Sequence, residues 1–285
     1  MIWKTTQREF DLRPGGLVMG ILNLTLDSFS DGGRFSTPEG RIDPATAAEF
    51  ALQMEAQGAA IIDIGGESTR PGAEPVPEEE ELARVVPVLR ALEGRLKAAI
   101  SIDTSKAAVA RAALEHGAEI VNDVTAMRGD PAMAEVVAAS GAGVILMHMQ
   151  GTPRTMQHAP VYDDVVGEVR AFFLQSYHAA LAAGIDPLSL AFDPGIGFGK
   201  TVEHNLALVA RLETLRVEGR PLVLGVSRKS FLGKLTGDPA LESRFWPTVA
   251  LTSVGSELGA DIFRVHDVRA NREALTMTEA IQAAC

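Results

Sequence analysis

The sequence predicts an α/β fold, a (β/α)8 TIM barrel that occupies residues 1–285 as one domain, with a short N-terminal hairpin at residues 1–15. Eight short apolar runs recur along the chain, and the stretches between them have the spacing of helices. Parallel strands need crossover helices, so eight such units in series fit a closed parallel barrel. No linker rich in Pro, Gly or Ser interrupts the series, which favours a single domain.

Most of the apolar runs end in a polar residue that can take part in chemistry. In order, the runs are GLVMGILN, AAIIDIGGE, AAISID, EIVND, GVILMH, LAFD, PLVLGVSRK and DIFRVH. Their polar ends are Asn23, Glu67, Asp103, Asn122 with Asp123, His148, Asp193, Lys229, and Arg264 with His266. Because the active site of such a barrel lies at the carboxyl ends of the strands, these side chains are the first candidates for a site.

The segments between the runs carry the start and stop signals of helices. Asp43 and Pro44 supply an N-cap and a first helical residue, and Gly58 fits the position just after the last turn. Apolar residues at helical spacing follow at Ala47, Phe50, Ala51 and Met54, and again at Leu82, Val85, Val86 and Leu89. Further helices are predicted from about residue 105 to 117 and from about 162 to 183. The hairpin is expected to cover the amino-terminal end of the strands.

Composition and charge limit the classes of partner. A net charge of −11 argues against nonspecific nucleic-acid binding, so an anionic substrate would need a local cluster of cations. The only cysteine is Cys285, which excludes an intrachain disulfide and favours a cytoplasmic setting. No apolar run approaches the roughly 20 residues that cross a bilayer, and the N-terminus lacks the apolar core of a signal peptide.

Two long connections follow strands and are expected to form lids or binding loops, residues 24–41 and 65–77. The first contains LTLDSFSDGG, whose alternative interpretation is a polar turn. The second contains GGESTRPGA, where Ser68, Thr69 and Arg70 lie between glycines and Pro71. Backbone N–H groups, hydroxyls and a guanidinium together suit phosphate or carboxylate, although a solvated loop has the same composition.

Asp103, Asn122 and Asp193 end three different strands. A buried carboxylate without a partner is costly, so each Asp either pairs with a cation in the fold or waits for a ligand. Carboxylates and an amide in this arrangement suit a flat heterocycle that presents both donors and acceptors. The turn that follows Asp193, DPGIGFGK, is not a P-loop, because Pro194 occupies the first glycine position. It is interpreted as a tight turn that brings Phe198 close to a ligand.

The last two strand ends suggest an anion site. GVSRKSFLG places Ser227, Arg228, Lys229 and Ser230 at the start of a helix, which attracts anions. Arg264 and His266 lie two residues apart, so both face the same way, and phosphate sites in these barrels often lie near the last two strands. His116, His148, His158 and His178 have no metal-ligand spacing, and no HExxH, Cys–His or EF-hand motif is present.

Together these motifs closely resemble those of the dihydropteroate synthases, a family of pterin-binding barrels. The matching stretches are MGILNLTLDSFSDGG, GGESTRPGAEPV, ISIDTSK, VNDVTA, MHMQGTPRTMQ, FDPGIGFGKT, GVSRKSFLG and FRVHDV. The chain departs from the family at Leu26, where Pro is usual, and in the stretch ESRFWPTVAL at residues 242–251.

The resemblance implies a cytoplasmic homodimeric transferase of folate biosynthesis. It would join 6-hydroxymethyl-7,8-dihydropterin diphosphate to p-aminobenzoate, with Mg²⁺ as cofactor, and release diphosphate. The implied pterin site is Asp103, Asn122, Met147, Asp193, Phe198, Gly225 and Lys229, and the implied p-aminobenzoate site is Thr69, Arg70, Pro71, Phe198 and Ser230. The implied diphosphate site is Asn23, Thr69, Arg264 and His266, with Asn23 also near Mg²⁺. The implied catalytic set is Asn23, Arg70, Asp103, Lys229, Arg264 and His266.

Without a Ser–His–Asp set or an activated Cys, a covalent enzyme intermediate is not expected, and a dissociative substitution is the predicted mechanism. Two other functions remain open from the sequence. A pterin-dependent methyltransferase would keep the pterin residues without the GGESTRPG and RVH motifs. A non-catalytic pterin-binding paralogue would be expected to have eroded loops.

Overall fold

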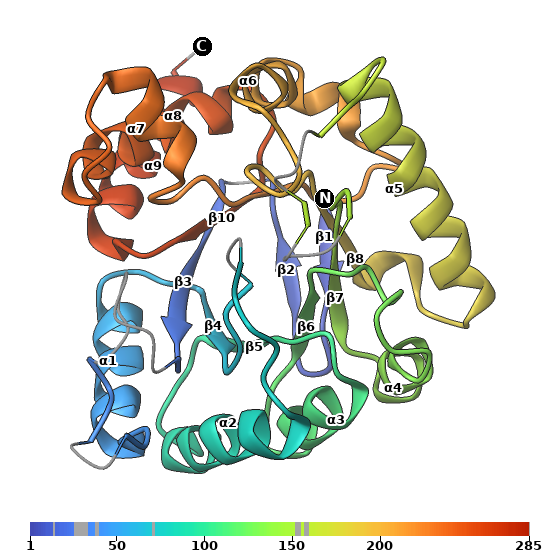
Figure 1. Cartoon of the computed structure of the whole chain (residues 1–285), viewed down its shortest axis with the longest axis vertical. Coiled ribbons are helices and arrows are strands. Elements are labelled where there is room, and N and C mark those ends of the chain that lie inside the picture. Colours follow the sequence, from blue (N-terminus) through green and yellow to red (C-terminus); the bar gives the residue numbers. More distant parts are fainter. Residues whose placement is uncertain are drawn as a thin grey trace.

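Eight parallel strands form the centre of the molecule, and helices surround them (Figure 1). The computed structural model describes residues 1–13, 15–25, 34–37, 40–69, 72–151, 155–156 and 160–284. The strands are β3 (Leu17–Asn23), β4 (Ile61–Gly65), β5 (Ala99–Asp103), β6 (Ile120–Asp123), β7 (Gly143–Met147), β8 (Leu190–Asp193), β9 (Val223–Leu224) and β10 (Ile262–Val265). They pair in the order β8-β7-β6-β5-β4-β3-β10-β9. A parallel bridge between Phe192 and Leu222 joins the two ends, so the predicted barrel is confirmed.

The helices lie outside the sheet and follow the strands in alternation, with one exception. They are α1 (Pro44–Ala56), α2 (Glu78–Leu92), α3 (Ala107–Glu115), α4 (Met133–Ser140), α5 (Val165–Ala182), α6 (Val202–Ala210), α7 (Ser230–Thr236), α8 (Phe245–Glu257) and α9 (Val268–Gln282). The exception is that α7 and α8 both lie between β9 and β10. Short 3-10 helices are η1 (Pro187–Ser189), η2 (Leu212–Leu215) and η3 (Glu242–Arg244). None of the helices in the described part of the chain is both long and apolar enough to cross a membrane.

The predicted helix signals are mostly confirmed. The Asp43 side chain accepts a hydrogen bond from the Ala45 N–H, which caps α1, and Gly58 has a φ of 102° just beyond its end. In α2, Val85 and Leu89 are buried as predicted, but Val88 is buried in place of Val86. The helix predicted from about residue 162 begins at Val165 instead, because Asp164 caps it by accepting from the Val166 N–H.

The barrel interior is apolar at the end where the strands begin. Every second strand residue points inward, and the lowest layer is Met19, Ile61, Ala99, Ile120, Ile145, Ala191, Val223 and Ile262. The intervening residues, such as Val18 and Leu22, pack on the helices in a second and larger core. Both faces of each strand are therefore covered, which explains why the apolar runs of the sequence show no alternation.

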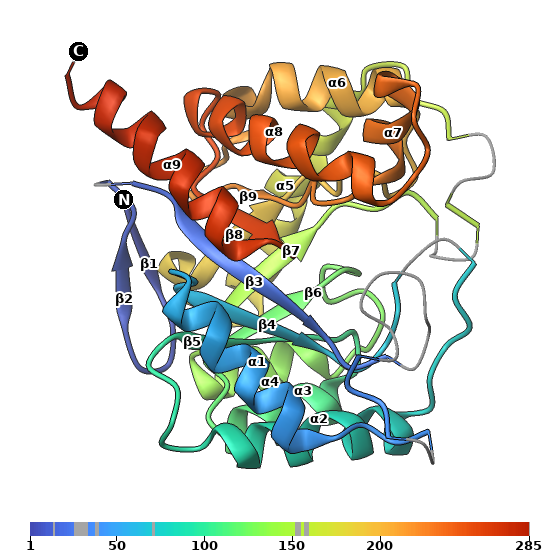
Figure 2. The same ribbon diagram turned by 90° about the vertical axis from the view of Figure 1, so that its left-hand side faces the viewer.

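The N-terminal hairpin closes this apolar end. Strands β1 (Ile2–Lys4) and β2 (Glu9–Asp11) pair antiparallel and lie beside the start of β3 (Figure 2). The Trp3 side chain is fully buried against the lowest interior layer, and its indole N–H donates to the Ser189 carbonyl oxygen at 2.9 Å. The hairpin predicted from the sequence is thus present and seals the bottom of the barrel.

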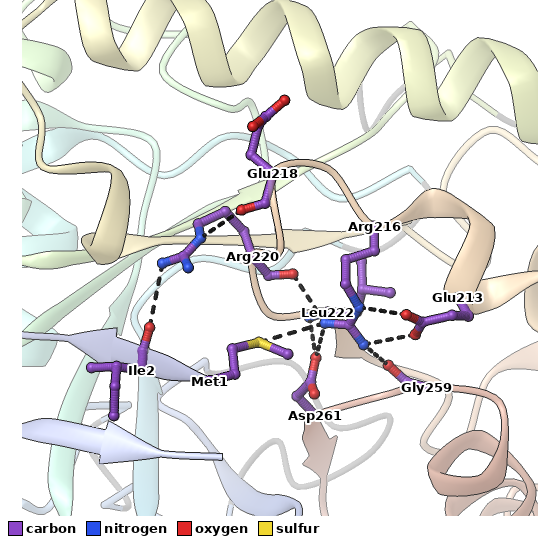
Figure 3. Close-up of polar contacts among 9 residues, drawn as sticks. All are labelled: Met1, Ile2, Glu213, Arg216, Glu218, Arg220, Leu222, Gly259 and Asp261. Atoms are coloured by element: carbon purple, nitrogen blue, oxygen red, sulfur yellow. Dashed lines mark hydrogen bonds and ion pairs between the residues drawn. The ribbon is translucent and has the colours of Figure 1, made fainter. Parts of the chain in front are cut away.

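Two arginines organise the approach to the short strand β9 (Figure 3). Arg216 donates to the carboxylates of Glu213 and Asp261, and to the Gly259 carbonyl oxygen at 2.7 Å. The Asp261 carboxylate also accepts from the Leu222 N–H at 2.7 Å. Arg220 donates to the carbonyl oxygen of Ile2 in the hairpin at 3.3 Å. These polar contacts join the segment before β9 to the segment before β10 and to the hairpin, where the two-residue strand β9 offers few ladder bonds.

Candidate active site

A cavity of about 650 Å³ opens at the carboxyl ends of the strands. All the predicted site residues that the structure describes line it. They are Asn23, Thr69, Asp103, Asn122, Met147, Asp193, Phe198, Gly225, Lys229, Ser230, Arg264 and His266. Arg70 and Pro71, together with Leu26, lie outside the described residues. The fold therefore collects side chains from distant parts of the sequence in one space, while their individual roles stay predictions.

Strand periodicity explains why these residues meet. Two residues above the apolar layer, the inward positions become polar, with Asp63, Ser101, Asn122, Asp193 and Arg264. One further layer up come Asn23, Asp103 and His266. The strands themselves end at Gly65, Met147, Leu224 and Val265, earlier than the runs suggested. Glu67, His148, Lys229 and His266 are consequently placed on the loops that follow.

Arg264 lies between two buried carboxylates. Its Nε donates to Asp63 Oδ2 and its Nη2 donates to Asp103 Oδ2, each at 2.6 Å. Asn122 Nδ2 donates to the same Asp63 oxygen at 3.2 Å. The other oxygens, Asp63 Oδ1 and Asp103 Oδ1, are buried without a hydrogen-bond partner in the described part of the chain. The predicted anion clamp is thus already paired within the fold, and at Asp103, which lines the cavity, the second carboxylate oxygen is left for a ligand donor.

Asp63 was not recognised from the sequence, although a signal for it was present. It lies in the middle of the apolar run AAIIDIGG, two residues before the end of β4. Asp63 lies two residues before Gly65, so its side chain points to the same face of the strand, into the barrel. It is completely buried. A charged residue inside a strand that is otherwise Ile-rich requires a partner, and here that partner is Arg264.

Asp103 should make stability depend on pH. Burial raises its pKa to about 7, against the attraction of Arg264. The folded state therefore binds a proton that the unfolded state releases at lower pH. The stabilisation from this group is complete below pH 4 and is lost as pH rises towards 7.

The Asp103→Asn variant tests this pH dependence. The difference in free energy of unfolding between this variant and the unmodified protein should shift in favour of the variant as pH rises. The shift should reach about 1.4 kcal/mol per pH unit between pH 4 and 7 and then level off. Urea denaturation from pH 4 to 9 measures this difference, and Asp163→Asn on an exposed loop provides the control. A difference independent of pH would show that Asp103 is ionised throughout.

The turn after Asp193 shapes the wall of the cavity. Asp193 Oδ1 accepts from the Gly195 N–H at 2.7 Å, and burial raises the pKa of this carboxyl group. Gly195 has a φ of 64°, and a Cβ there would lie 1.9 Å from the His148 carbonyl oxygen, so only glycine fits. The Phe198 ring centre lies 4.0 Å from Lys229 Nζ, a cation–π distance. The turn therefore fixes both the Asp193 carboxylate and the Lys229 ammonium.

A buried lysine supports the turn from behind. Lys200 Nζ donates to the Phe198 carbonyl oxygen at 2.9 Å and lies 3.0 Å from His148 Nδ1. Burial lowers the pKa of Lys200 to about 7, and it lowers the pKa of His148 to about 3. His148 is therefore neutral at physiological pH.

The opposite wall carries the remaining cationic groups. Ser227 Oγ lies 2.9 Å from His266 Nδ1, and Lys229 is the N-cap residue of α7. Arg228 is paired with the Asp267 carboxylate at 2.8 and 3.1 Å, so its charge is compensated within the fold. Among the basic residues of GVSRKSFLG, it is Lys229 that faces Phe198 and Asp193.

Further residues line the cavity. Glu67 and Ser68, candidates from the sequence without an assigned substrate, contribute from the loop after β4. Pro239, Leu241 and Arg244, which the sequence analysis did not single out, contribute from the segment between α7 and α8. Arg244 belongs to the atypical stretch ESRFWPTVAL, and it donates to the carbonyl oxygens of Arg228 and Pro239. Nothing local in the sequence marks Pro239 or Leu241, because only the folding of α7 and α8 over the barrel brings them to the cavity.

Asn23 is the residue predicted to lie near Mg²⁺. Within the ranges that the structure describes, no group of three or more His, Cys, Asp or Glu side chains is placed to hold a metal ion. Mg²⁺ often binds through one or two protein oxygens, several waters and the phosphates of a substrate. The Asn23 amide at the cavity mouth fits that arrangement, in which the ion arrives with an anionic substrate.

Comparison with known proteins agrees with this geometry. Residues 19–266 match the family model described as "Pterin binding enzyme". A curated dihydropteroate synthase of Synechocystis is 46% identical over 275 residues, which cover 96% of this chain and 93% of that protein.

Solved structures agree over nearly the whole length. The Xanthomonas albilineans dihydropteroate synthase with 4-aminobenzoic acid has a TM-score of 0.89 and 43% identity, covering 99% of this chain and 98% of that one. The Burkholderia cenocepacia enzyme complexed with 7,8-dihydropteroate has a TM-score of 0.88 and 41% identity, covering 99% and 97%. The chain therefore belongs to the pterin binding enzyme family, in the branch formed by the dihydropteroate synthases.

Proposed function

We propose that this protein is a transferase that condenses 6-hydroxymethyl-7,8-dihydropterin diphosphate with p-aminobenzoate to give 7,8-dihydropteroate and diphosphate. The observation that carries the proposal is that the cavity has two parts with different polar groups. Buried carboxylates and an amide line its floor, and Lys229, His266 and the Asn23 amide lie nearer the mouth. A heterocycle with several donors and an anionic substituent matches both parts. The relatives bound to 4-aminobenzoic acid and to 7,8-dihydropteroate support the same substrates.

The floor provides the hydrogen-bond pattern that a pterin requires. Asp193 keeps one oxygen for a ligand after its bond to Gly195, and Gly225 beside that oxygen has no side chain to block the approach. Asn122 contributes both an acceptor and a donor. The p-aminobenzoate site is assigned to the part of the cavity lined by Thr69, Phe198 and Ser230. Arg70 and Pro71 are assigned to the same site from the sequence alone, because they lie outside the described residues.

The chemistry follows from where charge can be stabilised. The C–O bond between the pterin methylene and diphosphate breaks, and its electron pair leaves with the diphosphate. The electron-rich dihydropterin stabilises the resulting cation, while His266 and Arg264, which both line the cavity, stabilise the leaving group. The aniline nitrogen of p-aminobenzoate is unprotonated at neutral pH, so it forms the C–N bond directly and then releases its proton to solvent.

Mg²⁺ is proposed as the cofactor, with Asn23 as its protein ligand. When bound, the ion would neutralise charge on the diphosphate and so make it a better leaving group. The chain's own contribution is to hold the amide oxygen of Asn23 at the end of β3, facing the cavity.

The two alternative functions are less well supported. A pterin-dependent methyltransferase would not need the second binding region formed by Thr69, Ser230 and the Arg264 and His266 of the RVH motif, and these four residues line the cavity here. A non-catalytic paralogue would not need the catalytic strand-end set, which is complete among the described residues.

Two measurements test the proposed activity. Calorimetry with the pterin diphosphate should show binding without p-aminobenzoate, and addition of p-aminobenzoate with Mg²⁺ should give dihydropteroate and diphosphate in equal amounts. Omission of Mg²⁺ with added chelator should slow turnover while the alcohol form of the pterin still binds. Binding without product would favour the non-catalytic paralogue, and an absence of pterin binding would exclude all three functions.

A homodimer in the cytoplasm is also proposed. Helices α8 and α9 expose apolar side chains to solvent, namely Trp246, Val254, Met277 and Ile281, and a second copy would cover them. The absence of a second cysteine beside Cys285 supports the location. Sedimentation velocity should find a dimer at micromolar concentration, and Trp246→Glu with Met277→Glu should give a folded monomer with an unchanged far-ultraviolet circular dichroism spectrum. A monomeric unmodified protein would contradict this assembly.

A further inference from the structure

Glu67 connects the two ends of the long loop after β4. The loop covers residues 65–77, of which 65–69 and 72–77 are described, and Ser68 and Thr69 on it line the cavity. Glu67 Oε1 accepts from the Val76 N–H at 3.2 Å. A single carboxylate therefore joins the outgoing and returning parts of the loop. Glu67 also lines the cavity, yet the proposed reaction gives it no chemical role.

Lys106 holds that carboxylate from behind. The Lys106 ammonium lies between Glu67 Oε2 and Glu81 Oε2. Lys106 is also the N-cap residue of α3. Hydrogen bonds to both carboxylates outweigh the effect of burial and raise the pKa of Lys106, so the side chain remains charged. Glu81 is completely buried in the first turn of α2, and its second oxygen has no partner within the described ranges. Lys106 is thus shared between a structural carboxylate and the loop.

The backbone before Glu67 is fixed by packing. A Cβ at Gly66 would lie 2.8 Å from Glu81 Cγ and 2.9 Å from Val85 Cγ2, so the chain lies directly on α2 at this point. The Arg84 guanidinium donates to the Gly66 carbonyl oxygen at 2.6 Å. Glu67 is the next residue along the chain, and its position depends on an ion pair between side chains. From here the loop extends to Thr69.

We propose that the Glu67–Lys106 ion pair is a positioning element that holds the loop at residues 65–77 ready to receive p-aminobenzoate. This inference rests on the proposed function, because it uses the part of the cavity that carries Thr69 as the p-aminobenzoate site. A loop that is in the binding-competent state only part of the time has an apparent affinity reduced by that fraction. Loss of the pair should therefore weaken p-aminobenzoate binding, while the pterin floor on the other strands is unaffected.

Two single variants remove the pair from either side. Glu67→Gln and Lys106→Met should each raise the KM for p-aminobenzoate about tenfold, with kcat at saturating p-aminobenzoate within about twofold of the unmodified protein. The Kd for the pterin, measured by calorimetry, should stay the same. Lys106→Arg should restore the KM, because a guanidinium can still reach both carboxylates. Arg95→Met, which breaks the exposed pair with Glu49, should change none of these values.

A double variant separates positioning from folding. Lys106→Met leaves the buried Glu81 carboxylate unpaired, which by itself lowers the melting temperature. Adding Glu81→Gln removes that charge, so Lys106→Met with Glu81→Gln should regain most of the lost melting temperature and keep the raised KM. Recovery of a normal KM in this double variant would overturn the inference, since the defect would then come from Glu81 alone.

Hydrogen exchange provides a readout that needs no turnover. Without substrates, amide exchange across residues 66–76 should be faster in Glu67→Gln and in the double variant than in the unmodified protein and in Arg95→Met. Unchanged exchange in Glu67→Gln, or a lower kcat with an unchanged KM, would overturn the positioning role. An unmodified protein that fails to make dihydropteroate would instead refute the proposed function, while the exchange result would still decide whether the pair holds the loop.

Discussion

Replacement of Arg264 by methionine should lower the free energy of unfolding by about 3–5 kcal/mol at pH 7 and abolish turnover. The guanidinium compensates two carboxylates, and Asp63 is completely buried while Asp103 is 7% exposed. Methionine fills similar space but leaves both acids facing each other without a cation. Urea denaturation measures the loss of stability, and the condensation assay measures the loss of activity.

Two controls identify the cause of that loss. Arg269→Met, which breaks an exposed pair with Glu273 on α9, should change stability by less than about 0.5 kcal/mol. Asp63→Asn added to Arg264→Met should recover part of the stability without recovering turnover, because the completely buried Asp63 carboxylate, which no cation then compensates, is gone. If Arg264→Met were as stable as the unmodified protein, the two carboxylates would not depend on this guanidinium.

Asp193→Asn should reduce affinity for the pterin by about 2–4 kcal/mol, or tens to hundreds of times. The Gly195 N–H donates to Asp193 Oδ1, so an asparagine would turn its carbonyl oxygen to that position. Its NH2 group would then point into the cavity, where the pterin also presents donors. Calorimetry with the alcohol form of the pterin measures the effect without turnover.

The matched control for this change is Asp163→Asn, an exposed residue before α5. It should leave pterin affinity and stability unchanged. Equal pterin affinity in Asp193→Asn and the unmodified protein would remove Asp193 from the binding site. A parallel loss of folding would be detected by denaturation, so a binding defect can be distinguished from an unfolded sample.

The barrel could be predicted from the sequence because the helix caps and apolar runs agree with the repeated strand–helix pattern of the whole chain. Each apolar run coincides with a strand, and Asp43 with Gly58 marks α1 to within a residue. Strand ends were less well predicted. The run PLVLGVSRK contains only two strand residues, because Gly225 and the turn beyond it leave the sheet.

Site residues at strand ends were predictable for a geometric reason. In a parallel barrel, inward-pointing polar residues at the ends of the runs face the same opening, as Asp103, Asn122 and Asp193 do. The partners of those residues were not predictable. Arg264 was interpreted as an anion clamp, but its pairing with Asp63 joins residues 201 positions apart and has no local sequence signal. Arg244 and Leu241 reach the cavity through the packing of α7 against η3, which the sequence pattern does not encode locally.

The hairpin has a consequence for how the chain assembles. Trp3 hydrogen bonds to a residue 186 positions away, and Arg220 reaches Ile2 across 218 positions. Such contacts close very large loops, and the entropy of that closure must be offset before they stabilise anything. The plug and the β8–β9 seam therefore form together, since each supplies the partners of the other. We therefore expect barrel closure to be a late and cooperative step, before which the edges of β8 and of the segment around β9 are open to pairing with other chains.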